Sequence, residues 1–506
     1  MIPTRPAFFA SPQTIDAVGR AHSVAFLIGG YDGSGNFGDL LQLDAALALL
    51  GRLEPGLLPL PVLERSRIAD HRDLADSFLQ RFPHAIFIAS DGDHEDELLP
   101  LPAPAGLPFA ALYLYGGGYL NPSWGERRLA MLRDAEALLG EAEVTTIRRL
   151  SSGLQVDPGW IGDLDEADAE RLRRFELLGA RDRRSAEALA ALGAAGRVVE
   201  TADDAVGALR KLRPDAPTTD ADERLRLNLH IAEHPWVSER PQAIAEFHAG
   251  LAGELGRGAG RPVLVQPLVA YDDRRVNERE ALDRLAAACA ARGVELAAPR
   301  VLLPTGLAPA LTAIGAAELT ISCSYHVALT SLLLGVPAIL LGDNAYYEQK
   351  AAGLAEAFDL PPSFALRSSM DPGECARQIA AAVLGEGRAA LRFNLALRAS
   401  WMRERRADAE AELLADLGGG LGAGLGGRID ELATRLRQRS AEPAELLARL
   451  SALETDEESP PPPAPGGQPG EGAAQLLLDE ITASRSWRMT APLRRIGALL
   501  RPRRRG

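Results

Sequence analysis

The stretch VAFLIGGYDGSGNFGDLLQLDAALALLG, residues 24–51, decides the fold class. An apolar run leads into a glycine-rich turn, and the turn leads into a segment with the leucine and alanine content of a helix. A buried strand that passes through a glycine turn into a helix is the first half of a βαβ unit. Glycines let a ligand approach the backbone, and a helix N-terminus presents N–H groups to an anion. The turn residues expected to line a binding site are Gly33, Gly35, Asn36, Gly38 and Asp39.

Short apolar runs and amphipathic stretches alternate along most of the chain, with an interruption at the turn-rich residues 213–217. This alternation predicts two successive α/β units with a ligand in the cleft between them. The predicted fold is α/β, with two Rossmann-like domains, a helical C-terminal extension and a basic tail. The expected segments are an N-terminal Rossmann-like domain at 20–215, a C-terminal Rossmann-like domain at 222–385, a helical extension at 386–458 with a glycine-rich joint at 417–428, a proline and glycine linker at 459–475 and a basic amphipathic tail at 476–506.

The charge of the chain is unevenly distributed. The 506 residues carry a net charge of −14, but residues 481–506 hold eight arginines and no acid, so the preceding residues carry −22. An acidic body argues against nucleic acid as a partner, because nucleic-acid binding needs a positive surface. The tail places Trp487 and Leu493 near one helical face among its arginines. It is either solvated, or it binds an anionic membrane surface or an acidic partner.

The cysteine spacing bears on compartment and metal binding. Cys289, Cys323 and Cys375 stand far apart and form no CxxC pair. This spacing fits a reducing cytosol and predicts neither a disulfide nor a thiolate metal site. The uncharged residues 319–342 contain polar residues and a Gly-Val-Pro break, so we interpret them as a buried helix and strand rather than a membrane span. We therefore expect a cytoplasmic protein without a bound metal.

A second glycine turn at residues 116–118 closes the apolar run ALYLY. Gly117 and Gly118 form either a backbone wall for a ligand or a site of helix–strand packing. The first turn also satisfies G-x-G-x-x-G, but Glu64 lies 26 residues beyond Gly38, farther than the dinucleotide fingerprint requires. Dinucleotide binding and a simple tight turn therefore remain alternatives for the first turn.

Two residues in the second half of the chain are candidates for chemistry. His326 follows an apolar run and begins an apolar helix. Its ring either projects into the cleft as a proton donor and acceptor or is a buried structural group. Lys350 is one of only two lysines in the chain, against 53 arginines. It is either a compact cation of the site or an exposed residue at a helix start.

The order of these motifs resembles the polysaccharide pyruvyl transferase family over roughly residues 24–385. The resemblance implies a GT-B-like fold, phosphoenolpyruvate as donor substrate, no further cofactor, and a glycan or lipid-linked sugar as acceptor. The implied product is a pyruvate ketal across two sugar hydroxyls. The matching segments are Gly30-Tyr-Asp-Gly33-Ser-Gly35-Asn36-Phe-Gly38-Asp39, Tyr115-Gly116-Gly117-Gly118, Gly153-Leu-Gln155-Val-Asp-Pro158, Gly179-Ala-Arg181-Asp182, Asp203-Asp204, Ser324-Tyr-His326, Gly335-Val-Pro337 and Tyr347-Glu-Gln-Lys350.

The resemblance also implies roles for individual residues. His326 would be the acid and base, and Arg181 and Lys350 would hold the anionic groups of the donor. Asp39 would hold the glycine loop or a sugar hydroxyl, because a carboxylate beside phosphate is repulsive unless it is paired.

One position departs from the family pattern. Family members usually carry an arginine two residues before the histidine, where this chain has Ser324. Serine supplies neither a charge nor a bidentate fork to a carboxylate. Either another cation, such as Arg148, Arg149 or Lys350, replaces the missing arginine, or the donor is not phosphoenolpyruvate.

Two other functions fit the same architecture. The first is a GT-B-type glycosyltransferase that uses a nucleotide sugar, and the second is a non-catalytic scaffold of polysaccharide assembly. The segment from Ser486 to Arg495 is similar to a segment at the C-termini of bacterial polysaccharide-assembly enzymes. With flexible linkers before it, such a tail would tether a cytoplasmic catalytic body at the inner face of the membrane.

Overall fold

The computed structural model describes residues 8–421 except 32, 34, 54–55, 65–81, 89–97, 195, 210–222, 233–236, 238–240, 272–277 and 303–306. The predicted proline and glycine linker and the basic tail lie outside the described residues. Every helix within the described part of the chain is too short or too polar to span a bilayer.

The first sheet is built around strand β2 (Ser23–Ile28), which pairs in parallel with β3 (Leu58–Glu64) and with β6 (Phe109–Leu114). Among the described residues it contains eleven strands. The further parallel strands are β4 (Ile86–Ile88), β8 (Thr146–Ser151), β10 (Leu177–Ala180), β11 (Arg197–Glu200), β9 (Leu154–Val156) and β7 (Gly117–Leu120). Strand β1 (Phe8–Ala10) pairs antiparallel with β4 and with β5 (Leu99–Pro100), so the sheet begins before the predicted domain boundary at residue 20.

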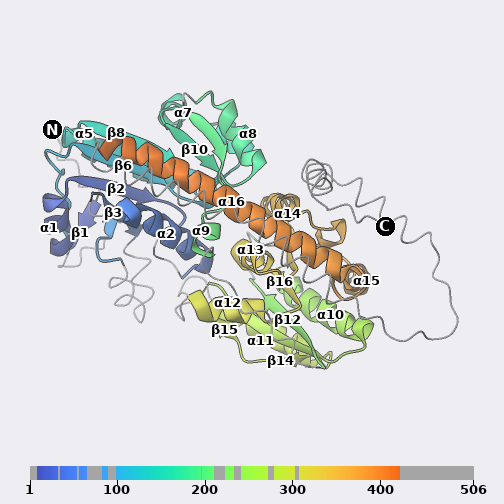
Figure 1. The fold of residues 1–506 in the computed structure, drawn as a ribbon. Coiled ribbons are helices and arrows are strands. Elements are labelled where there is room, and N and C mark those ends of the chain that lie inside the picture. The colour runs from blue at the N-terminus through green and yellow to red at the C-terminus, as the bar shows by residue number, and fades with distance from the viewer. Residues whose placement is uncertain are drawn as a thin grey trace, which may run out of the picture. The chain divides into compact units, whose positions relative to one another are not determined.

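Both faces of β2 are covered by helices, which explains why its sequence is apolar throughout. Val24, Phe26 and Ile28 pack in one buried cluster with helix α5 (Gly125–Glu141). Ala25 and Leu27 alternate with them and pack in a second cluster with helix α2 (Phe37–Leu50). Figure 1 shows α2 and α5 beside this sheet. The other described helices of this part of the chain are α1 (Pro12–Arg20), η1 (Gly51–Leu53), α6 (Pro158–Gly162), α7 (Glu166–Arg173), α8 (Arg183–Ala191) and α9 (Ala205–Leu209).

The described part of the second sheet has six strands, all parallel, with β12 (Leu225–His230) between β13 (Val263–Val269) and β16 (Leu319–Ser322). Its outer strands are β17 (Ala338–Leu340), β14 (Glu295–Leu296) and β15 (Arg300–Val301). The surrounding helices are α10 (Pro241–Ala259), α11 (Glu278–Ala290), α12 (Leu307–Gly315), α13 (Tyr325–Leu333), α14 (Ala345–Phe358), η2 (Pro362–Phe364) and α15 (Pro372–Val383).

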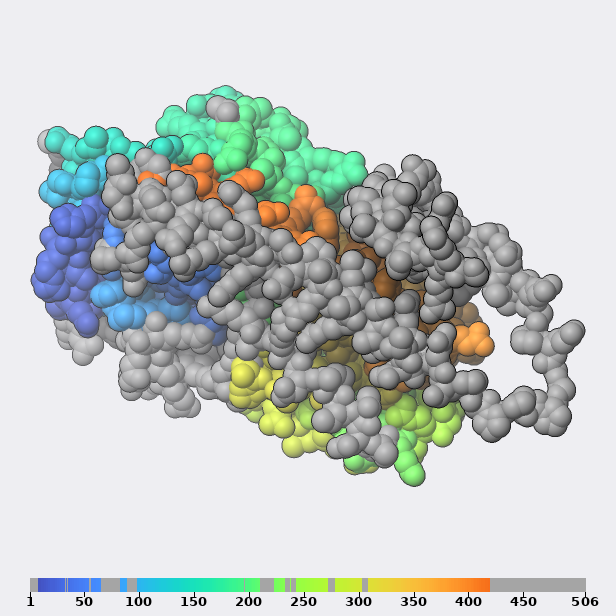
Figure 2. Space-filling view, in the orientation of Figure 1, coloured from blue at the N-terminus to red at the C-terminus, as the bar shows by residue number. Residues whose placement is uncertain are grey.

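The last described element, α16 (Arg388–Leu421), contributes to both cores. Leu395 and Ala399 pack in the cluster of the second sheet, whereas Leu413 and Leu414 pack in a cluster of the first sheet. Figures 1 and 2 show this helix in orange, and in Figure 2 it lies beside the green residues around β10 and β11. The predicted extension is thus partly integral to the two α/β units, and the glycines expected to begin a joint at residue 417 still lie within the helix.

Each sheet has a strand at which the order of strand addition reverses. In the first sheet β3 and β6 lie on opposite sides of β2, and in the second sheet β13 and β16 lie on opposite sides of β12. Ligands of open parallel sheets bind at the carboxyl ends of strands beside such a reversal. The segments leaving these ends include both predicted glycine turns and the turn before His326. The predicted α/β class with two Rossmann-like units is confirmed.

Acid is expected to destabilise the fold through His248 of α10. The ring is fully buried, and burial lowers its pKa to about 4, although the hydrogen bond from the ring to the Ile244 carbonyl opposes this effect. In the unfolded chain the His248 ring binds a proton near pH 6.5. The contribution of the buried neutral ring to the free energy of unfolding is therefore fully present above that pH and is lost as the pH falls toward 4. The loss reaches about 3 kcal/mol. Chemical denaturation of wild type and His248→Gln between pH 7 and pH 4.5 should give a shallower pH dependence in the variant, and equal slopes would contradict this account.

Candidate active site

The first glycine turn is fixed by a helix cap and by the second α/β unit. Asn36 caps α2, because its side-chain Oδ1 accepts hydrogen bonds from the Gly38 amide at 3.0 Å and the Asp39 amide at 3.4 Å. Gly33 has a φ of 101°, a left-handed conformation that favours glycine. The Phe37 amide donates to the Ala270 carbonyl at 2.8 Å, just beyond the end of β13. The turn therefore lies directly against the carboxyl end of the second sheet.

His326 approaches this turn from the second sheet, as the second residue of α13. Its ring packs against the backbone of Gly38, where an added Cβ would lie only 1.8 Å from Nδ1. The ring Nε2 lies 3.6 Å from Oδ2 of Asp203, and the residue is 9% exposed. His326 lies at the predicted strand-to-helix turn, and its ring packs against the first glycine turn. Its role in catalysis stays a prediction.

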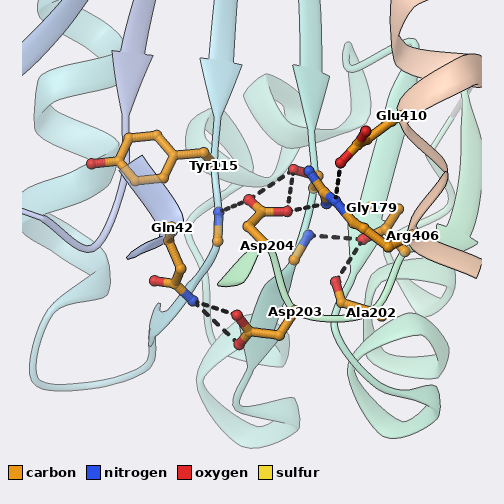
Figure 3. Close-up of polar contacts among 12 residues, drawn as sticks. Gln42, Tyr115, Gly179, Ala202, Asp203, Asp204, Arg406 and Glu410 are labelled. Carbon is orange, nitrogen blue, oxygen red and sulfur yellow. Dashed lines mark hydrogen bonds and ion pairs between the residues drawn. The ribbon is translucent and has the colours of Figure 1, made fainter. Parts of the chain in front are cut away.

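Asp203 is the carboxylate beside His326, and it is completely buried. Figure 3 shows the side chain of Gln42 pointing toward it. Its two carboxylate oxygens accept hydrogen bonds from Nε2 of Gln42 at 3.1 and 3.2 Å. Burial acts to raise the pKa of Asp203, but the neighbouring His326 ring and Arg181 guanidinium outweigh it and hold the pKa well below its usual range. Asp203 is thus ionised at neutral pH. An ionised carboxylate beside an imidazole orients the ring and stabilises the charge that forms when the ring accepts a proton.

Arg181 brings a guanidinium to the same carboxylate from the end of β10. Its Nη1 lies 3.6 Å from Oδ2 of Asp203, and its Cζ lies 4.0 Å from the ring centre of Tyr325. Tyr325 immediately precedes His326 at the start of α13. Arg181 and His326 therefore both face Asp203, which places a fixed positive charge next to the predicted acid and base.

The second glycine turn meets helix α14. The Tyr346 hydroxyl donates to the Gly118 carbonyl at 3.0 Å, and Nζ of Lys350 lies 4.1 Å from the ring centre of Tyr346. A Cβ at Gly118 would lie 2.6 Å from Oε1 of Gln155 and 3.4 Å from Cε of Lys350, so only glycine fits here without displacement. Gly117, with a φ of 132°, has the backbone freedom that the turn requires. The predicted anion-holding Lys350 thus lies against the predicted backbone wall.

Other predicted residues have different surroundings. Ser324 is the N-cap residue of α13, but its side chain makes no capping hydrogen bond. Arg149 pairs with Glu136 at 2.8 Å, and Arg148 lies 3.8 Å from Glu176, so both guanidinium groups face carboxylates outside the two glycine turns. These two arginines are therefore poor candidates for replacing the missing family arginine.

Asp39 lies beside the first strand end. A Cβ at Gly30 would lie 3.2 Å from Oδ1 of Asp39 and 3.5 Å from Oε1 of Gln42. This contact fits the predicted role of Asp39 in holding the glycine loop. It also places Gln42 between the first strand end and Asp203.

Sequence reasoning gave no role to several side chains of this site. Asp203 was part of a motif but was not connected to His326, because the two residues are 123 positions apart in sequence. Gln42 lies one turn beyond Asp39 on α2, and its helical spacing was the available signal. Tyr346 lies one turn before Lys350 on α14, so the same spacing applies.

Replacing Gly38 with alanine is expected to strain the junction between α2 and His326. The added Cβ would occupy the position of the imidazole, so the ring or the helix must shift. Overpacking of this kind costs about 1–3 kcal/mol. Gly140→Ala is the matched control, because nothing lies within 4 Å of its added Cβ on α5. Urea denaturation should show a lower free energy of unfolding for Gly38→Ala than for Gly140→Ala; equal values would refute the contact.

The family described as polysaccharide pyruvyl transferase matches residues 36–344. The chain belongs to this family. The matched residues include the Gly38, Asp203 and His326 constellation, whereas Lys350 and α16 of this family member lie beyond the match. No curated protein gives a significant sequence match.

Solved structures similar to this polysaccharide pyruvyl transferase family member include three described as UDP-N-acetylglucosamine 2-epimerases. One of them is 15% identical with a TM-score of 0.46, covering 79% of this chain and 96% of that one. A putative one from Listeria monocytogenes is 11% identical with a TM-score of 0.44, covering 77% and 96%. One from Methanocaldococcus jannaschii is 11% identical with a TM-score of 0.43, covering 73% and 98%.

Proposed function

We propose that this protein transfers the pyruvyl group of phosphoenolpyruvate onto two hydroxyls of a sugar, forming a ketal. The observation that carries the proposal is the junction of His326 and Asp203 between the two glycine turns in a member of the polysaccharide pyruvyl transferase family. A proton donor and acceptor therefore lies beside backbone that a ligand can approach closely.

Two cations near the junction suit an anionic donor. Phosphoenolpyruvate carries a phosphate and a carboxylate, and both need positive charge or N–H donors. Arg181 lies beside Asp203, and Lys350 lies beside Gly118. Arg181 is the guanidinium that we assign in place of the arginine missing at Ser324, because it packs on Tyr325 between that serine and His326.

The proposed reaction begins with a proton transfer from His326 to the methylene carbon of phosphoenolpyruvate. The π electrons of the double bond form the new C–H bond and leave C2 electrophilic. The first sugar hydroxyl bonds to C2 and gives its proton to the imidazole, which Asp203 stabilises. The C–O bond to phosphate then breaks, and phosphate leaves with the electron pair. The second hydroxyl closes the ketal, and its proton leaves with phosphate.

The acceptor that we propose is a glycan or lipid-linked sugar of a bacterial surface polysaccharide. A lipid-linked acceptor would present its sugar at the cytoplasmic face of the membrane. The basic tail at residues 476–506 would bring the enzyme to that anionic surface, or to a partner of polysaccharide assembly. A metal or further cofactor has no part in this proposal.

The assay that tests the proposal follows phosphate release by the full-length protein. Phosphoenolpyruvate is supplied with and without a pool of lipid-linked glycans, and parallel reactions contain nucleotide sugars instead. Release of phosphate from phosphoenolpyruvate only when the acceptor is present would support pyruvyl transfer. Turnover of a nucleotide sugar instead would indicate that the protein is a glycosyltransferase. The absence of turnover with either donor, in a folded protein, would favour the non-catalytic scaffold function.

A further inference from the structure

Two arginines on one face of α16 contact the segments that support Asp203 and His326. Arg403 and Arg406 are three residues apart, so their side chains leave the helix in similar directions. Arg406 contacts the first α/β unit, and Arg403 contacts α13. Neither arginine lies within the residues that the family matches.

Arg406 holds the residue next to Asp203. Its guanidinium pairs with the carboxylate of Asp204, and both side chains are completely buried (Figure 3). Asp204 also accepts hydrogen bonds from the Gly116 amide at 2.6 Å and from the Ser152 hydroxyl at 2.8 Å. One carboxylate therefore connects the second glycine turn, the end of β8 and α16. Because Asp203 and Asp204 are adjacent, this network restrains the backbone that carries Asp203.

Arg403 holds the helix that carries His326. Its Nη2 donates to the Leu333 carbonyl at 2.6 Å, at the last residue of α13. The final carbonyls of a helix have no partner within the helix, so a guanidinium there satisfies one of them. His326 is the second residue of α13. A helix of this length moves as a unit, so a restraint at its C-terminus also restrains the position of the ring.

We propose that α16 sets the separation of His326 and Asp203 across the two α/β units, with Arg403 and Arg406 as positioning residues. Nε2 of His326 and Oδ2 of Asp203 lie 3.6 Å apart and belong to different units. Helix α16 contacts the segment that supports each of these two groups. The ring also packs against the backbone of Gly38, which has no side chain to adjust. The catalytic consequence rests on the proposed function, whereas the positioning itself does not.

The test measures the reactivity of His326 in the full chain rather than turnover. Diethyl pyrocarbonate modifies accessible neutral imidazoles, and peptide mass spectrometry reports the rate at each histidine. Arg403→Ala is the main variant, because the Arg403 side chain is partly exposed, whereas that of Arg406 is completely buried. Arg403→Lys restores a donor to the Leu333 carbonyl. Arg197→Ala is the matched control, because Arg197 pairs with Glu412 and Asp416 of α16 without reaching either support.

We expect Arg403→Ala to raise the modification rate of His326 roughly fivefold through local opening. The buried His230 and His248 should keep their wild-type rates, and Arg403→Lys and Arg197→Ala should match wild type at all three. An unchanged rate at His326 in Arg403→Ala would overturn the proposal. An equal rise at all three histidines would also overturn it, because that result indicates general loosening. Neither result depends on the donor, so failure here is separate from failure of the proposed function.

Discussion

Replacing His326 with glutamine is expected to lower the turnover number for acceptor-dependent phosphate release by roughly 10²–10⁴-fold. Glutamine has hydrogen-bonding groups but cannot exchange a proton near neutral pH, so it removes the proposed acid and base while remaining polar. Binding of phosphoenolpyruvate should change much less, because the proposed anion contacts come from Arg181 and Lys350. Steady-state kinetics with purified full-length protein measures both quantities.

His248→Gln is the matched control for that experiment. His248 also belongs to the second α/β unit and is fully buried, but it bonds to the Ile244 carbonyl within α10. At pH 7.5 its substitution should leave the turnover number near that of wild type. If His326→Gln kept acceptor-dependent turnover while remaining folded, His326 would not be the acid and base.

Replacing Arg406 with methionine is expected to lower the free energy of unfolding by about 3–5 kcal/mol, because the buried carboxylate of Asp204 loses its cation. Gly116 and Ser152 would still donate to that carboxylate, but neither carries a charge. The double variant Arg406→Met/Asp204→Asn removes both charges and should recover much of the lost stability. Urea denaturation of wild type, both single variants and the double variant gives the coupling energy.

A small loss in Arg406→Met would contradict the account of this buried pair. So would a double variant as unstable as the sum of its single variants, because that result would mean that the two charges do not interact. Arg197→Ala serves as the control for an exposed ion pair on the same helix, and it should cost no more than about 1 kcal/mol.

The fold class followed from sequence because its signals are local. The apolar β2 segment, the glycine turn and the leucine-rich α2 segment are contiguous, and each has the composition of the element it forms. The position of His326 at a strand-to-helix turn was predictable for the same reason. The extra strand β1 was missed because its three residues follow a proline-rich start that gives no periodic pattern.

The arrangement of the site could not be read from sequence, because it depends on packing between distant segments. The pairing of Asp203 with His326 requires the two sheet edges to face each other. The burial of Arg406 requires α16 to pack on both units, although its charged sequence predicted a separate extension. Arg181 is a cation that the sequence motif contains, but its neighbours could not be predicted, because Asp203 and Tyr325 approach it from different units.

Pyruvyl transfer itself is tested most directly by identifying the product formed in heavy water. The full-length protein would be incubated in D₂O with phosphoenolpyruvate labelled with ¹³C at its methylene carbon and with a pool of lipid-linked glycans. The account predicts a glycan-bound ketal whose labelled methyl group carries one deuterium, detected by NMR and mass spectrometry, and an equal amount of phosphate. A glycan that gains no label while a nucleotide sugar is consumed, or a labelled product that keeps its methylene as an enol ether, would contradict it.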